Sequence, residues 1–330
     1  MQTNQIYVEP CLDTLKKMPD NFLDCVITSP PYWQLRDYGY DGQWGLEPTF
    51  HEYLENLWSM MDEIYRVLKP TGTCWINLGD TYNTISGGTR GLERAKKKGN
   101  TRSISKKNII GNGFQQQKAT DIANKCLLLI PHRFAIGCID RGWIIRNDVI
   151  WAKRNAMPES CTDRFSKKHE YFFFMTKSER YYFDLDSIRD KQIYGNERVR
   201  FSNHPNNGWK DKMQLEKKTD SQSVDDENDT TESNAVKGKN PGSVSDFWDI
   251  PTKPSTNEHY ASYNDELIRK PILAGCPEGG IVYDPFMGTG STAEVCLRAK
   301  RLFIGSEMSD SYVEIANKRI EPFLKQNQLF

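Results

Sequence analysis

A short proline-rich segment carries the residues best suited to bind a planar amino group. Residues 28–33 read Thr-Ser-Pro-Pro-Tyr-Trp and directly follow an apolar run that is typical of a buried strand. The two prolines fix φ and remove two backbone donors, so the loop is stiff and its carbonyls face outward. The Ser29 hydroxyl and the Pro30 carbonyl could accept hydrogen bonds from an amine, and Tyr32 and Trp33 offer aromatic faces for a planar ring. A structural turn with buried aromatic side chains explains the same spacing equally well.

A second segment has the composition of a loop that binds a nucleoside. Residues 284–292 read Asp-Pro-Phe-Met-Gly-Thr-Gly-Ser-Thr and lie between an apolar run and an amphipathic stretch. Glycines between a strand and a helix let the backbone approach a ligand, near the free N–H groups of the helix start. The next predicted strand is followed by Glu307, 19 residues beyond Gly288. An acid at that position is placed to bind both hydroxyls of a ribose.

The order of strand, glycine loop, helix, strand and acid favours a cofactor that contains adenosine over a simple tight turn. No lysine follows the glycines, which argues against a triphosphate-binding loop of the Walker type. The pattern does not distinguish among adenosine cofactors. A nicotinamide-dependent oxidoreductase therefore remains an alternative, although that class assigns no role to the proline-rich segment.

The elements that position these motifs are predicted from hydrophobic periodicity. Short apolar runs alternate with amphipathic stretches of helix length, which indicates an α/β fold with a mostly parallel sheet. Strands are predicted at residues 24–28, 73–78, 144–151, 171–176, 281–284 and 302–305. Helices are predicted at residues 50–68, 126–138, 266–274, 291–299 and 312–324.

Two polar segments interrupt this alternation. Residues 90–118 hold nine basic side chains and one acidic one, a local net charge of +8. Residues 202–246 hold only seven apolar residues in 45. Both segments are predicted to be insertions that are at least partly flexible, because neither contains enough apolar surface for a packed core.

The two motifs together resemble those of a known enzyme family. The chain is similar to the beta class of DNA amino-methyltransferases, in which the catalytic Ser/Asp/Asn-Pro-Pro-Tyr motif precedes the cofactor motif. Residues 284–292 match the family's S-adenosylmethionine motif. Further resemblances cover residues 65–72, 75–82, 151–160, 168–178 and 259–271. The resemblance implies a doubly wound, mostly parallel seven-stranded sheet of Rossmann-like type, S-adenosylmethionine as cofactor, and a target base flipped out of duplex DNA.

The matched motifs also imply the site residues. By resemblance, the catalytic residues are Ser29, Pro30, Pro31 and Tyr32, and the flipped base stacks on Tyr32 and Trp33. The cofactor-binding residues are expected to be Asp284, Phe286, Gly288, Thr289, Gly290 and Glu307, with Ser262 and Tyr263 near the methionine carboxylate. The family usually has an aspartate near the cofactor adenine, but Pro10 occupies that position in this chain. Glu9 and Asp13 are the candidate substitutes. Cys11 is interpreted as structural, because no glutamine follows it as it does in cytosine-C5 enzymes.

The chemistry of an exocyclic amine explains why these residues suffice. Its lone pair is delocalised into the ring, so acceptors that draw the amine toward tetrahedral geometry make it a better nucleophile for the sulfonium methyl. Within the family, Ser-Pro-Pro-Tyr is more typical of cytosine N4 than of adenine N6. The expected reaction is therefore site-specific N4 methylation of cytosine, with N6 methylation of adenine by the same mechanism as the alternative.

The resemblance divides the chain as follows. Residues 1–185 and 258–330 are predicted to form the catalytic domain, with a basic insertion at 83–125, and residues 186–257 are predicted to be a target-recognition region. The side chains expected to contact DNA phosphates are Lys96, Lys97, Lys98, Arg102, Lys106 and Lys107. The expected partners are double-stranded DNA and a cognate restriction endonuclease of a restriction-modification system, and the chain is expected to be a monomer or a homodimer.

Composition narrows the function classes further. Lys+Arg and Asp+Glu both number 44, so any basic binding face must be local. No apolar run reaches the roughly 18 residues of a membrane helix, and the first residues lack the pattern of a secretory signal. The eight cysteines include no Cys-x-x-Cys pair, which argues against a zinc ribbon or a redox motif. Neither His169 nor His259 has a metal-ligand partner at helical spacing, which argues against a metal site. A cytoplasmic enzyme without a metal is therefore expected.

Overall fold

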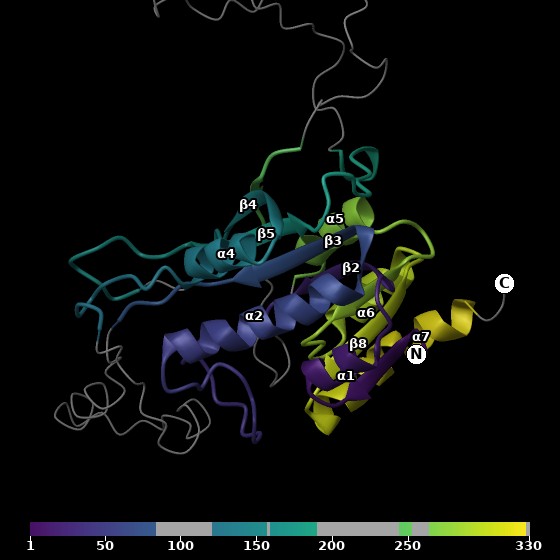
Figure 1. Ribbon diagram of the computed structural model, residues 1–330, viewed down its shortest axis with the longest axis horizontal. Coiled ribbons are helices and arrows are strands. Elements are labelled where there is room, and N and C mark those ends of the chain that lie inside the picture. Colours follow the sequence, from purple (N-terminus) through teal and green to yellow (C-terminus); the bar gives the residue numbers. More distant parts are fainter. Residues whose placement is uncertain (84–120, 157–158, 190–243, 253–263, 328–330) are drawn as a thin grey trace, which may run out of the picture. The chain divides into compact units, whose positions relative to one another are not determined.

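The apolar runs of the sequence form the strands of one sheet. The computed structural model describes residues 1–83, 121–156, 159–189, 244–252 and 264–327. The strands are β1 (Gln5–Val8), β2 (Leu23–Thr28), β3 (Leu68–Leu78), β4 (Ile144–Ala152), β5 (His169–Thr176), β6 (Phe247–Asp249), β7 (Ile281–Asp284) and β8 (Leu302–Glu307). The helices are α1 (Cys11–Lys17), α2 (Phe50–Val67), α4 (Ile130–Asp140), α5 (Asp265–Gly275), α6 (Ser291–Arg298) and α7 (Asp310–Asn327), with a 3₁₀ turn at Asp186–Ile188. Figure 1 shows how these elements are arranged.

The sheet is mostly parallel, as the sequence predicts. Its strand order is β1-β8-β7-β2-β3-β5-β4-β6. Among the described strands, β5 alone runs against its neighbours, and it pairs antiparallel with both β3 and β4. The remaining pairings are parallel. Long crossovers between parallel strands place helices on the faces of the sheet, which is the expected doubly wound arrangement.

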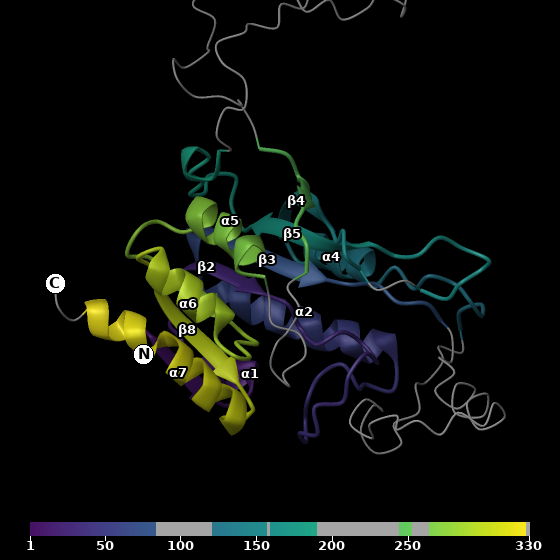
Figure 2. The same cartoon turned by 180° about the vertical axis from the view of Figure 1, so that it is seen from behind.

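Helices cover both faces of this sheet. On one face α1, α2 and α4 pack on a cluster that includes Val26 and Ile76, and on the other α5, α6 and α7 pack on a cluster that includes Cys25 and Ile27. Figures 1 and 2 view these two faces in turn. Successive residues of β2 thus enter different cores, because side chains alternate across a strand. This burial on both faces explains why residues 25–27 of β2 are all apolar.

The expected number of strands was wrong by one. The resemblance implied seven, whereas the described residues form eight because β6 adds an edge strand that pairs with β4 through Ile150↔Phe247 and the next two positions. A strand of three residues is too short to show a hydrophobic period, so the sequence does not reveal it. The short β1 and α1 escape prediction for the same reason.

One predicted helix begins later than expected. Residues 126–129 precede α4 instead of forming its first turn, because they pair with the segment that follows β3. The Leu128 N–H donates to the Thr81 carbonyl at 2.9 Å, and the Asn83 N–H donates to the Cys126 carbonyl at 2.7 Å. Leu129 then adopts a left-handed φ of 56°, which an α-helix cannot continue, and the helix starts at Ile130.

All these elements lie in one unit of the chain, residues 1–188 and 245–330. The second unit, residues 189–244, falls outside the described ranges except at its two ends. Most of the predicted basic insertion and target-recognition region is therefore not described, and the proposed domain boundaries stay predictions. No helix in the described ranges combines the length and the hydrophobicity that crossing a membrane requires.

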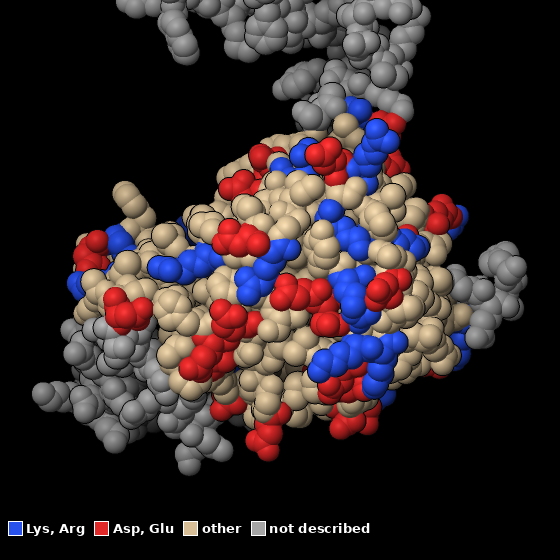
Figure 3. All heavy atoms as spheres, viewed as in Figure 1, with Lys and Arg blue, Asp and Glu red and all other residues tan. Residues whose placement is uncertain are grey.

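Charged side chains on the described surface are mixed in sign. On the face seen in Figure 3, which is that of α2, lysines and arginines alternate with aspartates and glutamates and form no continuous basic patch among the residues drawn in colour. This distribution agrees with the zero net charge of the chain. The described residues on this face therefore carry both signs of charge in alternation.

Candidate active site

The two motifs lie side by side at the carboxyl ends of adjacent parallel strands. β2 pairs with β7 through Val26↔Tyr283, so the loops that follow these strands leave the sheet at the same edge. The Thr28 hydroxyl at the end of β2 donates to Asp284 Oδ1 at the end of β7, at 2.6 Å. Ligands of open α/β sheets bind in crevices at this edge. Both loops line a cavity of about 770 Å³.

Asp284 supports the cavity from behind and is not part of its lining. Its carboxylate is 1% exposed and accepts hydrogen bonds from Thr28, from the Thr292 hydroxyl at 2.6 Å and from the Phe286 N–H at 3.0 Å. Burial raises the pKa of Asp284 to about 6, although these three bonds lower it. The sequence predicted a direct cofactor ligand. The structure instead places Asp284 where it ties β2, the glycine loop and α6 together.

Glycine is needed at the two positions of this loop for different structural reasons. Both adopt positive φ, 55° at Gly288 and 82° at Gly290. A Cβ on Gly288 would meet nothing within 4 Å, because this residue borders the cavity, whereas a Cβ on Gly290 would lie 2.7 Å from the Ala316 Cβ of α7. Gly288 thus keeps ligand space open, and Gly290 permits close packing of α7 against the start of α6.

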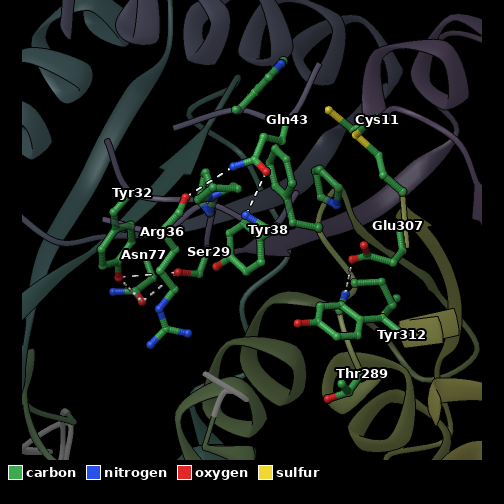
Figure 4. Close-up of a pocket in the computed structure, with 18 of the residues that line it drawn as sticks. Cys11, Ser29, Tyr32, Arg36, Tyr38, Gln43, Asn77, Thr289, Glu307 and Tyr312 are labelled. Carbon is green, nitrogen blue, oxygen red and sulfur yellow. Dashed lines mark hydrogen bonds between the residues drawn. The ribbon is translucent and has the colours of Figure 1, made fainter. Parts of the chain in front are cut away.

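Glu307 closes the glycine end of the cavity. It is the last residue of β8, and its Oε2 accepts the Gly288 N–H at 2.9 Å while its Oε1 accepts the Ser309 N–H at 2.9 Å. Burial raises the pKa of Glu307 above its usual value. Figure 4 shows Glu307 with Tyr312 and Thr289 at this end of the cavity, and Phe286 also lines it. Four predicted cofactor residues therefore meet in one wall: Phe286, Gly288, Thr289 and Glu307.

The proline-rich loop forms the other end. The Ser29 hydroxyl donates to Asn77 Oδ1 at 3.3 Å, and the Asn77 amide donates to the Tyr171 carbonyl at 3.0 Å, which fixes its orientation. The Tyr53 hydroxyl of α2 donates to the Pro31 carbonyl at 2.8 Å and holds the loop from below. Ser29, Pro30, Pro31 and Tyr32 all line the cavity. Figure 4 shows Ser29 and Tyr32 converging on Asn77.

Trp33 does not share this wall. Its side chain is 5% exposed, its Nε1 donates to the Glu47 carbonyl at 3.0 Å, and its ring packs edge-on against Phe50. The expectation that Trp33 stacks on a ligand was wrong, because the Pro-Pro turn directs Tyr32 into the cavity and the next side chain into the core. Of the two aromatic residues, only Tyr32 lines the cavity.

Several lining residues were not identified as site residues from the sequence. Asn77 is a polar residue inside an apolar strand, and that interruption is the signal that could have found it. Lys153 and Glu170 lie in two of the segments, residues 151–160 and 168–178, that resemble the family. Tyr32 donates to Glu170 Oε2 at 2.7 Å, and Glu170 Oε1 pairs with Lys153. Nothing in the local sequence indicates that these side chains meet.

The loop after the proline-rich segment covers the glycine end of the cavity. Its members Tyr38, Tyr40, Gln43 and Trp44 line the cavity. The Tyr40 hydroxyl donates to Ser309 Oγ at 2.6 Å, and the Trp44 ring lies 5.5 Å from that of Phe286, between ring centroids. The sequence predicted no role for this loop, because the contacts that place it over the cavity, those of Tyr40 and Trp44, are with residues more than 200 positions away.

The N-terminal segment also reaches the cavity. Pro10 precedes α1, and Glu9 lines the cavity while its carboxylate binds Thr14 at 2.9 Å and pairs with Lys17. Asp13 is not among the lining residues. Burial raises the pKa of Cys11 to about 12, so this cysteine remains a thiol at neutral pH and a poor nucleophile.

Other predicted site residues lie outside the described ranges. These are Ser262, Tyr263, Lys96, Lys97, Lys98, Arg102, Lys106 and Lys107. Their expected roles at the methionine carboxylate and at DNA phosphates stay predictions. Within the described ranges, no three His, Cys, Asp or Glu side chains are grouped as a metal site would require.

Comparison with known proteins gives a consistent picture. The N6/N4 methyltransferase family model, described as DNA methylase, matches residues 23–318. The chain is 34% identical to type II methyltransferase M.Cfr9I of Citrobacter freundii over 94% of this chain and 85% of that protein. It is 31% identical to type II methyltransferase M.SmaI of Serratia marcescens, over 97% and 91%. Among solved structures, PvuII DNA methyltransferase (cytosine-N4-specific) matches with a TM-score of 0.61 at 15% identity, covering 98% of this chain and 91% of that one, which is a likeness of fold.

Proposed function

Because this chain belongs to the N6/N4 DNA methylase family, we propose that it transfers a methyl group from S-adenosylmethionine to the exocyclic N4 amine of a flipped cytosine in duplex DNA. Family membership makes it a DNA methyltransferase, and cytosine as the target base is the finer proposal. The same membership removes the nicotinamide-dependent oxidoreductase from consideration.

The arrangement of Ser29 carries this proposal. A hydroxyl has one donor and two acceptor sites. The Ser29 hydrogen is directed to Asn77 Oδ1, which leaves the lone pairs of Oγ for a donor in the cavity. An exocyclic amine is such a donor. The Pro30 carbonyl belongs to the same stiff loop and supplies a second acceptor, and no described residue hydrogen-bonds to it.

The glycine end of the cavity fits S-adenosylmethionine. Gly288 leaves open the space that a side chain would fill. The Glu307 carboxylate offers about four acceptor sites, and the N–H groups of Gly288 and Ser309 occupy two of them. Ribose hydroxyls can take the others. Phe286, Gly288, Thr289 and Glu307 would hold the cofactor. When bound, it supplies an electrophilic methyl group on a sulfonium.

The residues of the proline-rich loop then act on the base. Tyr32 provides a ring on which the flipped base stacks, which offsets the few kcal/mol that unstacking from the duplex costs. Ser29 Oγ and the Pro30 carbonyl accept the two amine hydrogens and localise the lone pair on nitrogen. With its lone pair localised, the amine would be the nucleophile toward the electrophilic methyl group that the bound cofactor would supply. Ser29 Oγ and the Pro30 carbonyl would hold the two amine hydrogens, and one of these would be released as a proton to solvent. Catalysis on this account consists of positioning and charge placement, without a covalent enzyme intermediate.

The serine favours cytosine over adenine. Ser29 and its partner Asn77 are short, neutral groups, and the chain's Ser-Pro-Pro-Tyr motif resembles the form that is typical of N4 enzymes. Adenine presents the same kind of amine, and N6 methylation by the same residues is the alternative. The type II methyltransferases among the relatives also support a cognate restriction endonuclease as partner.

Product analysis tests the proposal. Unmethylated genomic DNA is incubated with the protein and S-adenosylmethionine, and its nucleosides are analysed by mass spectrometry. We expect N4-methylcytosine. N6-methyladenine would retain the mechanism and overturn the assignment of the base, and the absence of both products from a preparation that binds the cofactor would overturn the proposed activity on DNA.

Replacing Glu307 with alanine is expected to weaken S-adenosylmethionine binding by roughly 10- to 100-fold, the usual effect of losing hydrogen bonds to a charged group. Glu278→Ala is the matched control, because the Glu278 carboxylate is exposed, pairs with Lys300 and does not line the cavity. Titration calorimetry measures both affinities. An equal loss in the two variants would show that the effect does not arise at the cavity, and an unchanged affinity in Glu307→Ala would remove the ribose assignment.

A further inference from the structure

We propose that Lys153, held by Glu170 and Trp151, is a specificity-determining residue that donates a hydrogen bond to the ring nitrogen beside the target amine. For cytosine this atom is N3. The inference rests on the proposed function, since it concerns how the same cavity recognises the base. On this inference Lys153 recognises the edge of a base in which an amine donor lies next to a ring nitrogen that accepts a hydrogen bond.

The position of Lys153 is fixed by two neighbouring strands. It follows the last residue of β4, and Glu170 belongs to β5, whose pairing includes Trp151↔Glu170. The ammonium forms an ion pair with Glu170 Oε1 and lies 4.3 Å from the centroid of the Trp151 ring. The side chains of Lys153 and Glu170 are only 20% and 15% exposed. Both residues and Trp151 line the cavity.

This pair is joined to the catalytic loop. Glu170 Oε2 accepts the Tyr32 hydroxyl at 2.7 Å, and that hydroxyl is 3.0 Å from Asn77 Oδ1, which in turn accepts from Ser29. The ammonium is thus connected to the proposed amine acceptor by a continuous series of contacts. One end of this series accepts hydrogen bonds, and the other end donates them.

The donor capacity of Lys153 is not exhausted by these contacts. An ammonium has three N–H donors and no acceptor. Within the described part of the chain, Glu170 takes one donor and the π face of Trp151 attracts another, so a third is left for a ligand. Lys153 lines the cavity together with the proline-rich loop, whose oxygen atoms accept hydrogen bonds. Its remaining N–H donor is therefore suited to bind an acceptor on the edge of a base.

Donor and acceptor patterns decide which bases fit. Enzymes that flip a base read its Watson–Crick edge by hydrogen bonds. Cytosine presents the N4 amine beside the N3 acceptor, and adenine presents the N6 amine beside the N1 acceptor. Thymine and guanine present the reverse, a carbonyl beside a ring N–H, which would place an acceptor against Ser29 and a donor against Lys153. The pair of Ser29 and Lys153 therefore selects amino bases and rejects keto bases.

If the Lys153–Glu170 ion pair had only a structural role, the behaviour would differ. Replacing either residue would then lower the stability of the fold, and replacing the ring nitrogen of the base would not change the methylation rate through this pair. The test therefore varies the substrate as well as the protein. The first probe is 3-deazacytosine, which keeps the amine and the O2 carbonyl but replaces N3 by CH.

The experiment measures kcat/KM on duplexes that carry the methylated sequence identified by sequencing the product DNA. Cytosine and 3-deazacytosine are compared at the target position for wild type, Lys153→Met and the control Arg154→Met. Arg154 is the next residue of the chain, is 72% exposed and pairs with Asp249 away from the cavity lining. If the product is N6-methyladenine, adenine and 1-deazaadenine take the place of the two pyrimidines.

We expect wild type to lose roughly 10- to 100-fold on the deaza base, the effect of one charged hydrogen bond. Lys153→Met should lower kcat/KM on cytosine by a similar factor, and replacing cytosine by the deaza base should then lower it little further. Arg154→Met should keep the wild-type ratio of kcat/KM between the two bases. Equal wild-type rates on both bases would overturn the inference, whether or not any variant folds, and so would a wild-type ratio in Lys153→Met. Absence of methyl transfer by wild type to either base would overturn the proposed function itself, and the inference with it.

Discussion

Ser29→Ala is expected to lower the rate of methyl transfer by roughly 100- to 1,000-fold while S-adenosylmethionine binding is unchanged, which is the usual cost of removing one preorganised polar group that acts in the transition state. Ser29 is proposed to contact only the target amine, and its hydroxyl is oriented by Asn77. Alanine removes that acceptor without adding volume. The residues that would hold the cofactor come from the loops after β7 and β8 and keep their contacts.

Two measurements test this prediction. Single-turnover rates of methyl transfer report on Ser29, and calorimetric titration with S-adenosylmethionine reports on the integrity of the other end of the cavity. Ser59→Ala, on the exposed surface of α2, is the control, because its hydroxyl bonds only the Glu55 carbonyl of the same helix. Turnover at the wild-type rate in Ser29→Ala would remove the proline-rich loop from the mechanism.

Gly288→Val is expected to abolish detectable cofactor binding. A Cβ at this position meets no protein atom within 4 Å, so the valine side chain enters the space assigned to the cofactor. The backbone is also strained, because φ is 55° and β-branched residues avoid this region. Such strain costs on the order of 1–3 kcal/mol of folding free energy, which does not by itself account for a complete loss of binding.

A second glycine separates the two effects. Gly279 has a φ of 75°, its Cβ position is also open, and it lies in an exposed turn that does not border the cavity. Gly279→Val therefore carries similar backbone strain without blocking the cofactor. We expect a comparable fall in the melting temperature of both variants, measured by calorimetry, with cofactor binding lost only in Gly288→Val. Equal binding in both variants would contradict the placement of the cofactor beside Gly288.

The sequence by itself determined the framework of the protein and the location of its two motifs. β7 has the predicted boundaries, and β2 and β8 differ from prediction by one or two residues. The centres of these strands are apolar, at residues 25–27, 281–283 and 302–304, so local composition suffices to locate them. The proline-rich and glycine-rich loops are likewise specified locally, because their backbone restrictions reside in their own residues.

The tertiary structure decided which side chains meet in the cavity. Asn77 and Glu170 belong to strands whose antiparallel pairing sets their positions, and Trp33 and Asp284 were assigned to the wrong environment by local reasoning. Whether a side chain in a strand faces a core, a neighbour or a ligand depends on register, and a shift by one residue moves it to the opposite face. Register is fixed by contacts between segments far apart in the chain. The two motifs could therefore be identified from the sequence, whereas the polar contacts that join Ser29 to Lys153 could not.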